Sequence, residues 1–223
     1  MRNIIEKYFP EMGIDISWYS KKKITPNIPE KDNLDNLDIL VKKCKKCNLY
    51  KTRNNTVFGE GSHNSDIMII GEAPGKEEDD SGKPFIGRAG KLLTEFLKSI
   101  SLDRRSVFIT NTVKCRPPEN RNPSKEEINR YLPYLIKHIE LINPQILILL
   151  GSTALNAVIG DDNTISDVRG KWIEKKIGNC STLVMATFHP AFLMRQPAQK
   201  KLSWIDLKMI KKKISDLKIK IER

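Results

Sequence analysis

Three polar side chains of different chemistry each follow a short apolar stretch of the chain. Glu72, Asn111 and His189 stand just after runs that lack polar alternation and that glycine or polar residues close. Such runs are typical of strands buried on both faces of a parallel sheet. Because ligands bind outside the carboxyl ends of the strands in open parallel sheets, the carboxylate, the amide and the imidazole are expected to meet at one rim. The sequence therefore predicts a binding or catalytic site there.

The elements that must position these groups alternate along the chain. Strands are expected at Asp66–Ile70, Val107–Thr110, Ile146–Leu150 and Leu183–Phe188, with an edge strand at Arg169–Lys176. Helices are expected at Leu34–Val41, Ala89–Ile100, Lys125–Ile142, Thr153–Ile159 and Gln199–Glu222. The buried stripe of the last helix is expected to be Leu202, Ile205, Leu207, Met209 and Ile210. This alternation predicts an α/β fold of three α/β/α layers around a central, mainly parallel four-stranded sheet.

Composition and charge restrict the class of protein. The chain has 223 residues, with 39 Lys and Arg against 27 Asp and Glu, and a formal net charge of +12. A positive field of this kind commonly attracts nucleic acid, and no apolar stretch reaches the length of a membrane span. Residues 1–33 are expected to form an N-terminal extension and linker, and residues 34–223 one domain. We expect a monomeric, cytoplasmic protein without membrane contact, because the N-terminal segment lacks a signal-peptide pattern and four cysteines are too few for a disulfide framework.

Four motifs surround the candidate residues. They are GEAPGKEED at 71–79, GKPFIGRAG at 82–90, NTVKCRPPENR at 111–121 and HPAFLMR at 189–195. In this order they closely resemble the motifs of the family 4, iron–sulfur uracil-DNA glycosylases, and the resemblance runs from about residue 34 to the C-terminus. It implies a uracil-DNA glycosylase fold and an enzyme of base excision repair. That enzyme flips uracil out of DNA and hydrolyses the N-glycosidic bond, leaving an abasic site.

By this resemblance, Glu72, Asn111 and His189 are the catalytic residues. The Asn111 amide would accept from uracil N3–H and donate to O4, a pattern that cytosine reverses. His189 would donate to uracil O2 as negative charge builds there, and Glu72 would position water or offset positive charge on the sugar. From the residues alone, a loop-capping asparagine and a structural histidine remain alternatives.

The resemblance also supplies the other substrate contacts. Phe85 would stack on the flipped base, a contact worth about 1–3 kcal/mol. Backbone N–H groups of the turn that contains Gly71 and Ala73 would help to hold uracil O2, although such a turn could equally cradle phosphate. Glu78 would lie beside uracil C5 and refuse the thymine methyl. The alternative for its acidic run is a solvated loop.

Contacts with DNA beyond the flipped base are expected after the histidine. In the family, the loop there approaches the minor groove. Leu193 or Met194 would wedge into the gap that the flipped base leaves, with Arg195 on phosphate. Lysines of the last helix would add salt-sensitive attraction. The expected partner is therefore uracil-containing DNA.

The cysteines form a pattern of their own. Cys44 and Cys47 make a C-x-x-C pair, which together with Cys115 is typical of an iron–sulfur or zinc site. The family has a fourth cysteine further on, and Tyr131 stands in its place here. We expect a 4Fe–4S cluster on the three cysteines, with Tyr131 or an external group at the fourth iron. Recruitment of Cys180 and a degenerate site without metal are the alternatives.

Two other functions stay open at this point. One is an inactive or altered iron–sulfur protein that binds nucleic acid, which the missing cysteine makes conceivable. The other is a phosphate-binding α/β hydrolase built on the glycine turn. The presence of Glu72, Phe85, Asn111 and His189 together favours the glycosylase.

Overall fold

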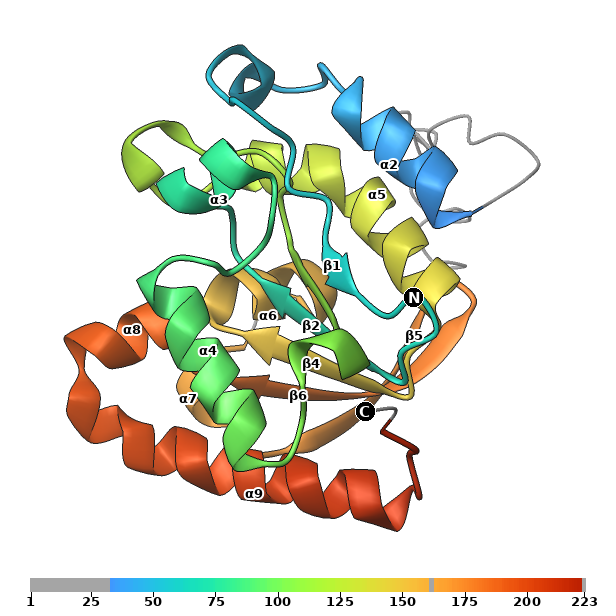
Figure 1. Ribbon diagram of the computed structural model, residues 1–223, viewed down its shortest axis with the longest axis vertical. Helices are drawn as coiled ribbons and strands as arrows, with labels where there is room; N and C mark the ends of the chain where they lie inside the picture. Colours follow the sequence, from blue (N-terminus) through green and yellow to red (C-terminus); the bar gives the residue numbers. More distant parts are fainter. Residues whose placement is uncertain (1–32, 161–162, 222–223) are drawn as a thin grey trace, which may run out of the picture.

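The runs predicted as strands lie side by side in one six-stranded sheet (Figure 1). The computed structural model describes residues 33–160 and 163–221. The strands are β1 (Glu60–Gly61), β2 (Ile67–Gly71), β3 (Phe108–Asn111), β4 (Ile146–Leu150), β5 (Trp172–Ile177) and β6 (Cys180–Thr187). In the order β1-β3-β2-β4-β6-β5, the four central strands are parallel, and β1 and β5 pair antiparallel at the edges. The predicted α/β fold is confirmed, and β1 is an addition.

Helices cover both faces of this sheet, which gives the expected three layers (Figure 1). They are α2 (Leu34–Lys42), α3 (Lys76–Ser81), α4 (Arg88–Ser99), α5 (Lys125–Ile142), α6 (Ser152–Val158), α7 (Ile165–Val168), α8 (Pro190–Arg195) and α9 (Lys200–Asp216). Short 3-10 turns are η1 (Asn48–Lys51), η2 (Arg104–Ser106), η3 (Pro118–Asn120) and η4 (Pro197–Gln199). None of the helices in the described part of the chain is long and apolar enough to cross a bilayer.

Alternation along the strands explains why the central runs are apolar throughout. In β2, Ile67 and Ile69 pack in the cluster that contains residues of α4 and α9. Met68 and Ile70 pack in the opposite cluster, with residues of α5 and α6. Both faces of the strand are thus covered, and no polar residue is needed on either.

Helix α5 has the bounds that its sequence predicts. The Ser124 side chain accepts from the Glu127 backbone N–H at 3.2 Å, and the Glu127 carboxylate accepts from the Ser124 N–H at 2.7 Å. This capping box satisfies two N–H groups at the start of the helix. Asn143 ends the helix with a left-handed φ of 49°. The helix carries Tyr131 and Tyr134 on its buried side.

Helix α9 departs from its prediction in two ways. It ends at Asp216, not near Glu222, because the chain turns at Lys218 with a φ of 54°. Ile205 was expected in the buried stripe but is 47% exposed, whereas Leu207 and Ile210 are buried. The expected N-terminal extension lies outside the described residues, apart from the residue that caps α2.

The acidic run that follows the glycine turn is a helix, not a solvated loop. Asp79 on α3 is 1% exposed, and its carboxylate accepts from the backbone N–H groups of Asn54 and Asn55 at 3.0 and 3.3 Å. Negative residues in the first turn suit the positive end of a helix. The alternative of a solvated acidic loop is therefore wrong for this residue.

Candidate active site

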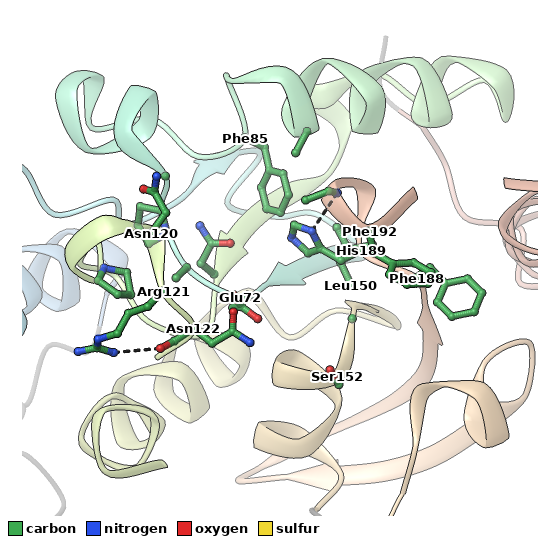
Figure 2. A pocket seen from close by; sticks show the side chains of 18 of the residues that line it. Glu72, Phe85, Asn120, Arg121, Asn122, Leu150, Ser152, Phe188, His189 and Phe192 are labelled. Atoms are coloured by element: carbon green, nitrogen blue, oxygen red, sulfur yellow. Dashed lines mark hydrogen bonds between the residues drawn. The ribbon is translucent and has the colours of Figure 1, made fainter. Parts of the chain in front are cut away.

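A cavity of about 620 Å³ lies at the carboxyl ends of β2, β3, β4 and β6 (Figure 2). Glu72, Phe85, Asn111 and His189 all line it, as the predicted rim required. Ala73 and Glu78 are also in its wall. The residues that the sequence singled out in four separate motifs therefore line one cavity.

Asn111 ends β3 and is 2% exposed. Its Oδ1 is buried and has no hydrogen-bond partner within the part of the chain that the structure describes. Leaving a buried acceptor unpaired costs about 1–3 kcal/mol, so this oxygen is suited to receive a ligand N–H. A Cβ at Gly71 would lie 2.5 Å from this oxygen and 2.4 Å from Phe85 Cζ. Only glycine leaves room for both groups.

Phe85 forms one wall of the cavity, and its ring centroid lies 5.7 Å from that of His189. Its backbone has a left-handed φ of 52°, which is uncommon for a residue with a side chain. Arg104 holds this conformation by donating to the carbonyls of Pro84 and Phe85 at 2.8 and 3.0 Å. A Cβ at Gly90 would lie 1.8 Å from the Phe85 carbonyl oxygen. The ring is thus fixed by its surroundings.

Glu78 connects the glycine turn to the loop that carries Phe85. One carboxylate oxygen accepts from the Gly75 N–H at 3.0 Å. The other accepts from the N–H groups of Ile86 and Gly87 at 2.9 and 2.8 Å. The sequence did not indicate this positioning role. Glu78 also lines the cavity, so this positioning role leaves room for the contact with uracil C5 that the resemblance implies.

His189 is a neutral imidazole with one nitrogen already engaged. Burial, together with the smaller effect of the positive charge of Arg195, lowers its pKa to about 4. Nδ1 accepts from the Ala191 backbone N–H at 3.2 Å (Figure 2). In a neutral ring the proton must then reside on Nε2, so the free nitrogen is a hydrogen-bond donor.

Glu72 stands on the opposite side of the cavity from Phe85 (Figure 2). Its carboxylate accepts a hydrogen bond from the hydroxyl of Thr153, on the first turn of α6. The carboxylate is therefore held in place by an element that follows a different strand.

The backbone of Asn111 is held by a buried lysine. The fully buried ammonium of Lys114 donates to the Asn111 carbonyl at 2.8 Å and to the Thr110 hydroxyl. Burial lowers the pKa of Lys114 to about 7.

Comparison with known proteins decides the family. A model described as the uracil-DNA glycosylase superfamily matches residues 58–211. The type-4 uracil-DNA glycosylase of Saccharolobus solfataricus is 44% identical over 197 residues, covering 85% of this chain and 91% of its own. That of Pyrobaculum aerophilum is 45% identical over 170 residues, with 74% and 87% covered, and that of Thermotoga maritima is 46% identical over 156 residues, with 70% and 80% covered.

The chain belongs to the uracil-DNA glycosylase superfamily. The resemblance to the type-4 enzymes that its motifs indicate is confirmed by these relatives.

In this glycosylase fold, the helix after His189 places its side chains differently from the prediction. Leu193 is fully buried, so it does not stand at the surface as a wedge for DNA. Met194 is 38% exposed, and Arg195 is exposed and lines the cavity. The correction follows from α8, because consecutive residues of a helix point in different directions and residue 193 faces the interior. Of the two expected wedge residues, only Met194 is accessible.

The cavity of this glycosylase domain also has walls that the sequence did not single out. Among them are Asn120, Arg121, Asn122, Ser166, Phe188 and Phe192. Asn120 and Arg121 end the NTVKCRPPENR motif, Asn122 follows it directly, and Phe192 lies inside HPAFLMR, so the motifs held a signal for these residues. Ser166 belongs to the short helix α7, for which no sequence signal was noted.

The cysteine pattern of the family gathers in one buried cluster. Cys44, Cys47 and Cys115 pack with Tyr131 and Tyr134 between α2 and α5. Cys180 belongs to a different core cluster, where its thiol lies 3.8 Å from the Pro144 carbonyl oxygen. The recruitment of Cys180 as fourth ligand is therefore not supported.

The donor set does not fit a cluster held by four thiolates. The site offers three thiols and the hydroxyl of Tyr131, whose pKa is raised by burial, so that it is a neutral phenol. The Cys115 thiol already contacts this hydroxyl at 2.7 Å. Among the residues that the structure describes, no three or more Cys, His, Asp or Glu side chains are arranged to hold a metal ion.

Proposed function

We propose that this chain is a uracil-DNA glycosylase of base excision repair. It flips uracil out of DNA and hydrolyses the bond between N1 and C1′, which leaves an abasic site. The observation that carries this proposal is the buried Oδ1 of Asn111, which has no hydrogen-bond partner among the described residues and lies in the same cavity as the ring of Phe85 and the donor nitrogen of His189. The type-4 relatives support the same activity.

Recognition of uracil depends on Asn111 and Phe85. The amide oxygen accepts from N3–H and the amide nitrogen donates to O4, while the Phe85 ring stacks on the base. Cytosine carries an unprotonated N3 and an exocyclic amine, so both contacts would oppose like groups. Each buried group left unpaired in that case costs about 1–3 kcal/mol. Glu78 lies in the wall, where it would exclude the methyl group of thymine.

Cleavage moves the electron pair of the N1–C1′ bond onto the base. Negative charge then builds on uracil O2, and the Nε2–H of His189 donates to it. A neutral donor suits this task because burial has removed the proton that would make the ring an imidazolium. Fixed donors aimed at developing charge commonly contribute more than any other single effect in such sites.

The sugar becomes cationic as the base leaves, and Glu72 responds to this charge. Its carboxylate, held by Thr153, offsets the positive charge or orients the water whose oxygen bonds to C1′. The water proton is released, and uracil departs with the electrons of the broken bond. Atoms and charge balance without any electron transfer.

The wider interface is expected on α8. Met194 is the exposed residue that could enter the gap left by the flipped base, and Arg195 would contact phosphate. Uracil-containing DNA is the partner in this proposal. A monomeric state and a cytoplasmic location stay predictions from the sequence.

The 4Fe–4S cluster that the resemblance implies has no part in these steps. Such a cluster would be structural, holding loops near the DNA face, since hydrolysis of an N-glycosidic bond needs no redox chemistry. Cys44, Cys47 and Cys115 would be its ligands, with the position of Tyr131 left for the fourth. The cluster stays a prediction of the family resemblance.

The test is uracil release from a labelled oligonucleotide in the presence of chelator, followed by alkali. We expect strand cleavage at uracil only. Asn111→Ala, His189→Ala and Glu72→Ala should each lower the rate, by about 5-fold to 150-fold for the loss of 1–3 kcal/mol. Ser99→Ala is a matched control, because its exposed hydroxyl donates to the Phe96 carbonyl at 2.6 Å and lies outside the cavity lining. Near-normal rates for all three variants would exclude these roles.

Binding without cleavage would favour the second candidate, an inactive nucleic-acid-binding protein. Activity on nucleotides that depends on added metal would favour a phosphate-binding hydrolase instead. The same oligonucleotide assay, run with and without metal, separates these outcomes.

A further inference from the structure

Tyr131 belongs to the buried cluster that contains the three cysteines of the pattern. It lies on α5, is 2% exposed and packs with all three cysteines of the pattern. A buried phenol must find a hydrogen-bond partner, because an unpaired hydroxyl costs about 1–3 kcal/mol. The partner of the Tyr131 hydroxyl is the Cys115 thiol. Tyr131 therefore stands in the place of one expected cluster ligand and forms a hydrogen bond with another.

Cys115 has two direct side-chain partners. The Tyr131 hydroxyl lies 2.7 Å from Cys115 Sγ, and Arg53 Nη1 donates to the same sulfur at 2.9 Å. In a four-thiolate cluster, each ligating sulfur is bonded to iron, and the cluster core fills the space between the ligands. At hydrogen-bond distance, no atom fits between the sulfur and the hydroxyl that stands in the place of the fourth ligand. The two organic groups therefore occupy the space in front of this thiol.

The same side chains join three separate segments. Arg53 also donates to the Lys42 carbonyl at 2.6 Å, which connects the end of α2 to the thiol. Tyr134 packs with Cys44 in the same buried cluster, and the Lys46 ammonium lies 4.6 Å above the Tyr134 ring. Together these contacts fasten the segment with both N-terminal cysteines onto α5. This is the structural task that a cluster would perform in the family.

We propose that Tyr131 converts the cysteine site of this chain into a clamp of hydrogen bonds, in which the phenol and the Arg53 guanidinium hold Cys115 in place of iron. The thiol is then part of the fold and not a metal ligand. The clamp is independent of the glycosylase reaction, so it can be tested without measuring activity.

The test compares iron and sulfide uptake by the full-length chain and by Tyr131→Cys, both purified anaerobically and then incubated with ferrous iron, sulfide and thiol reductant. Metal content and visible iron–sulfide absorbance are the readouts. We expect the native chain to remain free of iron and zinc, and Tyr131→Cys to take up a cluster, because it restores the fourth thiolate. Stoichiometric metal in the native chain would overturn the proposal. If neither protein takes up iron, Tyr131 is not the residue that keeps the native chain from binding a cluster, and the proposal is overturned.

Thermal unfolding tests the clamp by itself and does not depend on the folding of the cysteine variant. Tyr131→Phe keeps the ring and removes the hydroxyl. We expect its midpoint temperature to fall by about 2–4 °C. The midpoint of the native chain should not change when chelator is added. A Tyr131→Phe midpoint equal to that of the native chain, or a native midpoint lowered by chelator, would contradict the hydrogen-bonded clamp.

Discussion

The hydroxyl of Thr153 donates a hydrogen bond to the carboxylate of Glu72, across 81 positions of sequence. Glu72 follows β2 and Thr153 opens α6 after the neighbouring strand β4. Two adjacent parallel strands thus deliver a carboxylate and the donor that orients it to the same edge of the sheet. Thr153 is a positioning residue in this arrangement.

Thr153→Val should therefore lower kcat with little change in KM. A hydrogen bond to a charged group is worth about 1.5–3 kcal/mol, which corresponds to about 10-fold to 150-fold in rate. Thr153→Ser keeps the hydroxyl and should retain most of the activity. Steady-state kinetics on a uracil oligonucleotide is the measurement. In a Glu72→Gln background the valine substitution should cost much less, and full additivity would argue against the positioning role.

The acid side of the pH profile should report His189. Its pKa is lowered to about 4, so the ring is neutral above that pH and loses its neutral form as the pH falls through 4. We expect the contribution of His189 to kcat/KM to be constant between about pH 5 and pH 8. A histidine-dependent decline centred near pH 6.5 would show that the ring is not shielded from water. Comparison with His189→Asn separates this ionisation from those of other groups.

Stability should depend on the same ionisation. In the unfolded chain the histidine titrates near its ordinary pKa of about 6.5. Between that value and about 4, the unfolded state binds more protons, so the native state loses stability as the pH falls. His189→Asn should unfold with a weaker pH dependence across this interval. Denaturant unfolding at a series of pH values measures the difference.

Glu78→Gln should weaken both the fold and substrate binding. The carboxylate accepts from three backbone N–H groups, and a glutamine would direct its own N–H₂ at some of these donors. We expect a loss of about 1–3 kcal/mol in the free energy of unfolding, together with a higher KM, because the Phe85 loop is released. Glu77→Gln, one residue earlier and exposed, is the matched control. Equal stability of the two variants would contradict the role of Glu78.

Leu193 and Met194 should separate folding from DNA contact. Leu193→Ala removes a fully buried side chain and should cost about 2–5 kcal/mol of stability. Met194→Ala should change stability by no more than about 0.5 kcal/mol, since the residue is partly exposed. We expect Met194→Ala to lower the rate of uracil release from duplex DNA more than the rate from single-stranded DNA. A parallel loss on both substrates would argue against a wedge at this position.

The sequence was most informative where one local rule governed the outcome. The capping box at Ser124 set the start of α5, and the unbroken apolar runs identified the central strands. It was less informative where long-range packing decided. Ile205 fits a helical stripe but faces solvent, while the polar Asp206 is buried and forms an ion pair with Arg169 at 2.5 Å.

The same division holds for the site. The motifs placed Glu72, Asn111 and His189 in one cavity, because strand ends of a parallel sheet meet. They did not reveal Thr153, since a hydroxyl in a helix start carries no pattern that names its distant acceptor. The orientation of Leu193 was likewise invisible without the axis of α8.

The contacts of Arg104 affect which bases can enter the cavity. Arg104 donates to the carbonyls of Pro84 and Phe85 and, at 3.0 Å, to the carboxylate of Glu60. These contacts connect the Phe85 wall of the cavity to β1, at the edge of the sheet. The width of the slot is then set before any nucleotide arrives. We therefore expect a purine, with its second ring, to meet an aromatic wall that Arg104 holds in place from behind.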